Sequence, residues 1–92
     1  MKGISLKIFN RYGYKNQLKK LSEEVYEFIE AVLLYESGKG DIKNIVEELG
    51  DVEFILYQFR NFYKIRTKKI MSIRRFKGKR QLKRMEDEKS GK

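Results

Sequence analysis

The chain has 92 residues with 22 Lys and Arg against 13 Asp and Glu, a formal net charge of +9, and it contains no Cys, His, Pro or Trp. Without Cys and His there is no disulfide framework, thiolate nucleophile, Ser-His-Asp triad or zinc site with nitrogen or sulfur ligands. The length predicts a single domain whose core is near the lower limit for standing alone, so we expect burial against a second copy.

Apolar residues recur at three- and four-residue spacing, which together with the lack of Pro predicts helices throughout. Residues 1–14 form an N-terminal arm, either a short helix or an extended segment. The first long helix is expected from about Asn16 to Glu36, followed by a loop over residues 37–40 with two Gly. Its apolar stripe consists of Leu18, Leu21, Val25, Phe28, Ile29, Val32 and Leu33.

The second long helix is expected to begin after Asp41, whose side chain can cap it, and to reach about Lys64. Its apolar face is Ile42, Ile45, Val46, Leu49, Val52, Leu56 and Tyr63. Because a short loop joins the two helices, they should lie antiparallel. The sequence therefore predicts an all-α fold, one domain over residues 1–92, built as an antiparallel helical bundle whose core is completed by oligomerisation into a homodimer or homotetramer.

The positive charge is concentrated in a basic C-terminal helix and tail over residues 66–92, which hold 12 of the 22 basic residues and three of the 13 acidic ones. Residues 1–65 are consequently neutral. The helix itself is expected from about Lys68 to Glu86. No secretory signal is visible, and no apolar run approaches the roughly 18 residues that span a bilayer. We therefore expect a cytoplasmic protein that does not enter membranes.

Two acidic motifs repeat at a spacing of 24 residues, one on each long helix: Glu23-Glu24-Val25-Tyr26-Glu27 and Glu47-Glu48-Leu49-Gly50-Asp51. At about 100° per residue, the acidic pairs lie at the border of the apolar stripes. In each motif, the next residues along the same side of the helix as the pair at i and i+3 are apolar. Antiparallel packing brings the pairs together, although two Glu-rich amphipathic helices can also look alike by chance. The residues of these pairs are Glu24, Glu27, Glu48 and Asp51.

Four partly desolvated carboxylates repel one another unless a cation lies between them. Mg²⁺ is the expected cofactor, with Mn²⁺ as a possible substitute, because a hard divalent ion takes carboxylate oxygens and keeps positions for water and phosphate. Glu23 and Glu47 point away from the shared lane, so we interpret them as solvated residues or as residues that support the ligands indirectly. Glu53 lies in the middle of the apolar face, where it could pair with a basic residue of the third helix or of another subunit.

Taken together, the motifs resemble the all-α nucleotide pyrophosphohydrolases of the MazG type, which include relatives acting as dUTPases. The acidic elements are Glu23-Glu24-x-x-Glu27 followed by Glu48-x-x-Asp51. The flanking elements are Gln17-x-x-Lys20-Leu21, Asp51-Val52-Glu53 with Gln58, and Lys77-x-x-Arg80-Gln81-Leu82-x-Arg84. The resemblance covers about residues 15–86 and extends to small phage and Firmicute proteins of this type.

The resemblance implies that Glu24, Glu27, Glu48 and Asp51 are the catalytic metal ligands. The implied reaction is hydrolysis of a nucleoside triphosphate to the monophosphate and pyrophosphate, with in-line attack of an activated water at the α-phosphorus. Because the loop over residues 37–40 is short, a base-recognition pocket would have to come from aromatic residues or from a neighbouring subunit. The aromatic candidates are Tyr26, Tyr35, Phe54 and Tyr57.

Lys77, Arg80 and Arg84 share one lane of the basic helix with Ile70 and Ile73. Docked on the first two helices through the two Ile, this lane would bring its cations near the carboxylates to bind substrate phosphates. A solvated basic face is the alternative. A competing function is nonspecific nucleic-acid binding by the basic third, which would give no reason to gather four acids on two helices.

Overall fold

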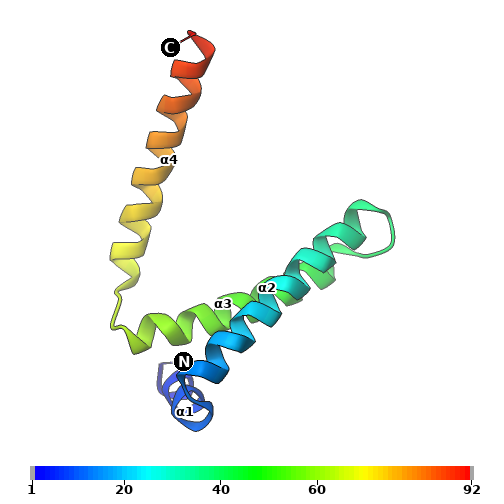
Figure 1. The fold of residues 1–92 in the computed structure, drawn as a ribbon, viewed down its shortest axis with the longest axis vertical. Coiled ribbons are helices and arrows are strands. Elements are labelled where there is room, and N and C mark those ends of the chain that lie inside the picture. Colours follow the sequence, from blue (N-terminus) through cyan, green and yellow to red (C-terminus); the bar gives the residue numbers. More distant parts are fainter. Residues whose placement is uncertain (1, 92) are drawn as a thin grey trace.

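The computed structural model describes residues 2–91 as four helices (Figure 1). They are α1 (Lys2–Tyr12), α2 (Tyr14–Glu36), α3 (Ile42–Phe62) and α4 (Thr67–Lys89). No strand occurs within residues 2–91, so the predicted all-α fold is confirmed. The N-terminal arm is helical rather than extended. Met1 and Lys92, the outermost residues of the predicted arm and basic tail, lie outside the described residues.

Local signals account for the helix ends. Gly13 has a φ of 85°, a left-handed conformation that glycine adopts without strain, and it separates α1 from α2. The Asp41 side chain accepts a hydrogen bond of 2.9 Å from the Asn44 N–H, so the predicted cap of α3 is present. After α3, Lys64 has a φ of 57°, and the chain turns sharply before α4 begins.

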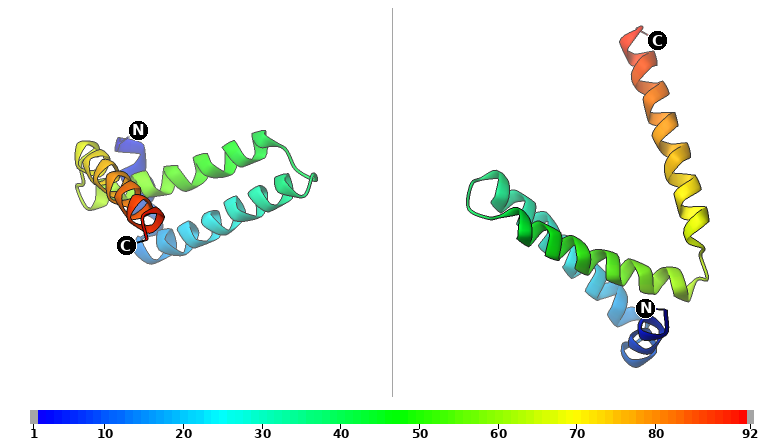
Figure 2. Two further views of the ribbon diagram at one scale, coloured as in Figure 1. Left: turned by 90° about the horizontal axis from the view of Figure 1, so that it is seen from above. Right: turned by 180° about the vertical axis from the view of Figure 1, so that it is seen from behind.

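Helices α2 and α3 form an antiparallel hairpin, and α1 lies across its open end (Figures 1 and 2). Aromatic rings hold α1 in place: Phe9 stacks on Phe62 with centroids 4.6 Å apart and meets Phe59 edge-on at 5.4 Å. The hydroxyls of Tyr14 and Tyr63 are 2.7 Å apart and hydrogen-bonded. This packing fixes α1 at the open end of the hairpin, next to the buried polar residues described below.

The hairpin buries only part of each apolar stripe. The buried apolar side chains are Phe9, Ala31, Val52 and Ile55, and polar side chains are buried with them, namely Ser5, Gln17, Glu24 and Gln58. Most residues of the two predicted apolar stripes are exposed in the single chain: Leu18, Val25, Ile29 and Leu33 on α2, and Ile42, Val46, Leu49 and Leu56 on α3. One neighbouring helix covers only part of each stripe, because each stripe is wider than the contact that a single helix can make.

Helix α4 projects away from the rest of the molecule (Figures 1 and 2). A hydrogen bond from the Arg60 guanidinium to the Thr67 hydroxyl joins it to α3 at the turn, but within residues 2–91 it packs against none of the other helices. The radius of gyration is 17.2 Å, against about 12 Å for a compact domain of this length. The predicted docking of α4 through Ile70 and Ile73 is therefore wrong for the single chain. The turn at Lys64 directs α4 outwards, and two Ile provide too little apolar area to draw it back.

Candidate metal centre

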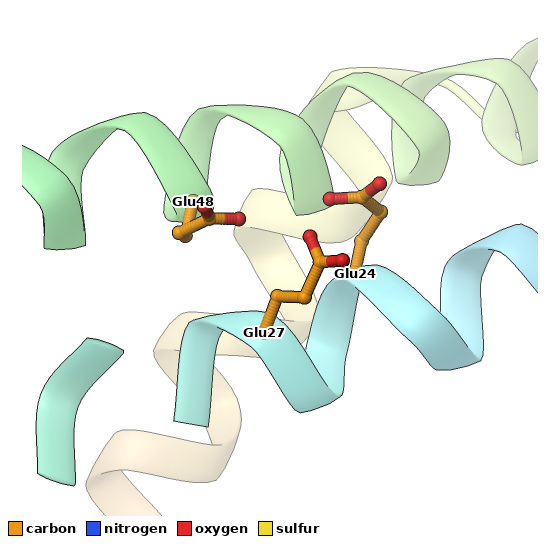
Figure 3. A group of neighbouring side chains, drawn as sticks. All are labelled: Glu24, Glu27 and Glu48. Carbon is orange, nitrogen blue, oxygen red and sulfur yellow. The ribbon is translucent and has the colours of Figure 1, made fainter. Parts of the chain in front are cut away.

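Glu24 and Glu27 on α2 and Glu48 on α3 point toward one another across the hairpin (Figure 3). One carboxylate oxygen from each lies within 4.8 Å of the others. The i, i+3 spacing places Glu24 and Glu27 on one side of α2, and the antiparallel packing sets Glu48 opposite them. Glu24 is buried, Glu48 is half-buried and Glu27 is exposed, so the group extends from the hairpin interior to its surface.

The electrostatics of this group are unfavourable without a cation. The Oε2 atoms of Glu24 and Glu48 are buried and have no hydrogen-bond partner among the described residues. Lys20 Nζ lies 3.1 Å from Glu24 Oε1, and this contact raises the pKa of Lys20. The pKa of Glu27 is raised above its usual 4.5, chiefly by the charge of Glu24 and further by burial and by Glu48. One lysine therefore compensates only part of the negative charge that three carboxylates contribute.

Asp51 does not join the three Glu within the 4.8 Å that relates them to one another. Its side chain is exposed and lines a cavity that Glu24 also lines. The structure thus brings together three of the four carboxylates predicted from the repeat and leaves the fourth on the wall of the adjoining cavity. Glu23 and Glu47 are exposed, and they belong neither to the group of three Glu nor to the cavity wall. This agrees with the prediction that they point away from the other carboxylates.

The cavity next to the carboxylates has a volume of about 550 Å³. It lies between α1, α2 and α3, and its walls are Ile8, Tyr12, Gln17, Lys20, Glu24, Asp51, Phe54, Ile55 and Gln58. Gln17 Nε2 donates a 2.7 Å hydrogen bond to Gln58 Oε1 in the buried part of this wall. The bond leaves one amide oxygen and one amide NH₂ of the pair for further hydrogen bonds. Such a cavity, in which aromatic and aliphatic side chains lie beside amide and charged groups, has the character of a site for a polar small molecule.

Sequence reasoning identified part of this wall. Of the aromatic candidates for a base pocket, Phe54 lines the cavity, whereas Tyr26 and Tyr57 line other surface hollows. Tyr12 was not among the candidates, because the sequence left residues 1–14 open between a short helix and an extended segment. The buried amide pair was also missed as a structural unit, although Gln17, Lys20 and Gln58 were among the residues that carried the family resemblance.

The predicted phosphate-binding residues Lys77, Arg80 and Arg84 lie on α4, and all three are exposed. Since α4 packs against none of the other helices in residues 2–91, the single chain does not bring these cations to its own carboxylates. Helix α4 buries none of its side chains. None of the helices in the described part of the chain has the length and apolar character needed to cross a membrane.

The four helices and the facing carboxylates define an all-α protein with a candidate site for an oxygen-ligated cation beside a small-molecule cavity. The model of the MazG nucleotide pyrophosphohydrolase domain matches residues 13–75, which include α2, α3 and every carboxylate discussed above. The chain belongs to this family. No matching curated protein and no matching solved structure was found.

Proposed function

We propose that the protein is a Mg²⁺-dependent nucleoside triphosphate pyrophosphohydrolase that converts (d)NTP to (d)NMP and pyrophosphate. Glu24, Glu27, Glu48 and Asp51 are its proposed metal-binding and catalytic residues. The observation that carries the proposal is that Glu24 and Glu48, whose carboxylates approach within 4.8 Å, each hold a buried oxygen without a partner, beside a cavity of about 550 Å³. Membership of the nucleotide pyrophosphohydrolase family supports the reaction type.

The donor set fits Mg²⁺, and also Mn²⁺. All candidate ligands are carboxylate oxygens, which hard cations prefer, and the chain has no His or Cys to favour a softer metal. Glu24, Glu27 and Glu48 would hold the ion, and Asp51 would reach it from the cavity wall. When bound, the ion would neutralise negative charge on the phosphate oxygens during hydrolysis. Both unpartnered oxygens would then have a partner, which removes the cost of burying them.

The other residues of the cavity would bind and orient the nucleotide. Lys20 Nζ is next to Glu24 and carries a positive charge that a phosphate oxygen can share. The Gln17–Gln58 pair offers one acceptor and one donor to the edge of a base, and Tyr12 and Phe54 offer aromatic surface to its face. In this arrangement the triphosphate lies toward the carboxylates and the base lies toward α1.

A second copy of the chain would complete the fold. At about 100° per residue, the exposed stripes of α2 and α3 fall on the same side of the hairpin, opposite the carboxylates. Only four apolar side chains are buried among residues 2–91, too few for an independent core. We therefore propose a homodimer or homotetramer that buries these stripes. Within it, α4 of one copy would carry Lys77, Arg80 and Arg84 to the substrate phosphates of another.

The decisive experiment is a screen of the common NTPs and dNTPs with Mg²⁺ in which pyrophosphate release is measured. Release from at least one of them, lost in Glu48→Gln, supports the proposal. In the same assay, Lys77→Ala and Arg80→Ala should raise KM or lower kcat, because each removes a charge that binds phosphate. If no nucleotide is hydrolysed and the protein binds nucleic acid in a salt-sensitive way, it is a helical nucleic-acid-binding protein without this chemistry.

A further inference from the structure

Residues 74–84 of α4 contain seven basic residues and no acidic one. Three of them, Lys77, Arg80 and Arg84, have a proposed role with substrate phosphates. The remaining four have none: Arg74, Arg75, Lys79 and Lys83. All seven side chains are exposed. This basic segment, residues 74–84, is the strongest charge concentration in the chain, and hydrolysis of a nucleotide explains less than half of it.

The basic segment is electrostatically unfavourable as an isolated helix. Arg75–Lys79 and Lys79–Lys83 are like-charge pairs at i, i+4, which destabilise a helix by a few tenths of a kcal/mol each. The only ion pair on α4 within the described residues, Lys83–Asp87 at 4.0 Å, lies at its C-terminal end. Because residues 1–65 hold as many basic as acidic side chains, a second copy of the chain brings no net negative charge to offset the seven cations. An external polyanion can.

The cations are distributed around most of the helix. At about 100° per residue, the seven of them cover roughly three quarters of its circumference. The remaining strip is apolar and contains Met71, Leu82 and Met85, all exposed. A flat anionic surface, such as a membrane, or a single strand along one side would contact only one face and leave the other cations unmatched. A ligand with phosphates on both sides of the helix matches them.

The major groove of duplex DNA has this geometry. It is about 12 Å wide, which admits one α-helix, and phosphates line both of its walls. Helix α4 has 23 residues, a length of about 35 Å or one turn of the duplex. It projects freely, so a duplex can approach it without meeting the hairpin (Figures 1 and 2). Phe76 is 63% exposed within the basic segment and can contact a thymine methyl group there.

We propose that α4 binds the phosphates of double-stranded DNA through the basic segment, without strong sequence preference. This site is separate from the carboxylate group and does not depend on the proposed hydrolysis. The neutralised helix would lose its internal repulsion, so its helicity should rise on binding. When no nucleotide is bound, Lys77, Arg80 and Arg84 can contact the duplex together with the other four cations. Seven phosphate contacts then correspond to a slope of about −6 in a plot of log K against log salt.

Fluorescence anisotropy with a labelled duplex of about 20 bp, two helical turns, tests the proposal at salt concentrations between about 50 and 200 mM. The test variant is Arg74→Gln/Arg75→Gln/Lys79→Gln/Lys83→Gln, which keeps the three residues with a proposed substrate role. Its slope should fall to about −3 and its affinity by more than about 100-fold. Gln is a good helix former, so circular dichroism should show α4 intact.

The matched control removes the same charge from the hairpin by Lys15→Gln/Lys19→Gln/Lys39→Gln/Lys43→Gln, all exposed positions. It should bind DNA within about threefold of the wild type, since counterion release depends on contacts made at the site. An equal loss in both variants would overturn the proposal, because net charge alone would then explain binding. So would stronger binding to phosphatidylserine vesicles or to single strands than to the duplex, or dissociation of an oligomer in the test variant only.

Discussion

Replacing Glu48 by Gln should have opposite effects on stability with and without Mg²⁺. The substitution keeps the shape of the side chain but removes one charge of the three-carboxylate group. Without metal, the wild-type protein carries an unpartnered Glu48 oxygen and repulsion between Glu48 and the two Glu of α2. The variant relieves both, and its amide can donate a hydrogen bond to a facing carboxylate.

The size of the effect follows from the geometry. Two like charges at the 4.8 Å limit of this group repel by about 3.5 kcal/mol at an effective dielectric constant near 20. Lys20, at 3.1 Å from Glu24, offsets part of this repulsion by pairing with the charge of Glu24. The free energy of unfolding of the metal-free variant should therefore exceed that of the wild type by about 1–2 kcal/mol, which raises Tm by about 5–10 °C in a domain of this size.

Mg²⁺ should reverse the order. At a concentration of about 100 Kd, the ion stabilises the wild type by about 2.7 kcal/mol, whereas the variant lacks a ligand and gains little. Thermal unfolding followed by circular dichroism, once with EDTA and once with Mg²⁺, measures both effects. Pyrophosphate release by the variant should fall to background.

The control is Glu30→Gln, an exposed residue of α2 outside the group, for which both melting curves should match the wild type. Two results would refute the reasoning. A variant less stable than the wild type in EDTA would mean that the three carboxylates do not repel one another. A variant stabilised by Mg²⁺ as much as the wild type would mean that Glu48 is not a ligand.

Four further outcomes are expected. The raised pKa of Glu27 should make Mg²⁺ affinity, measured by calorimetry, fall about tenfold per pH unit as the pH drops below that pKa, because proton and metal compete for one carboxylate. In the metal-free protein, protonation of Glu27 increases the free energy of unfolding. This contribution is fully present below about pH 4.5 and is lost as the pH rises through the raised pKa of Glu27. A free energy of unfolding in EDTA that does not change over this pH range would contradict this. Leu49→Lys on the exposed stripe should convert the proposed oligomer to a monomer in sedimentation, while Lys19→Gln should leave it assembled. Gln17→Leu should lower the free energy of unfolding by about 1–3 kcal/mol by leaving the Gln58 amide unpaired, and Gln17→Leu/Gln58→Leu should restore most of it in denaturant unfolding.

The boundaries of the hairpin helices were predictable because their causes are local. Asp41 caps α3 through a side chain three residues from the N–H that it binds, and the Gly-containing loop over residues 37–40 ends α2. The facing of Glu24, Glu27 and Glu48 was also predictable, because helical spacing and antiparallel packing leave few alternatives. These parts of the fold depend on interactions within a few residues or on one pairing of neighbouring helices.

The sequence by itself determined the helices, the hairpin and the gathering of three carboxylates on it. Tertiary structure decided which edge of each wide apolar stripe is buried, so that Gln17 and Gln58 lie inside while Leu49 and Leu56 stay exposed. It also decided that Asp51 lines the cavity and that α4 leaves the hairpin at the turn around Lys64. Each of these features depends on which of several alternative packings of the helices has the lowest free energy. The alternatives bury similar areas, so the spacing of residues along the sequence does not show which one is favoured.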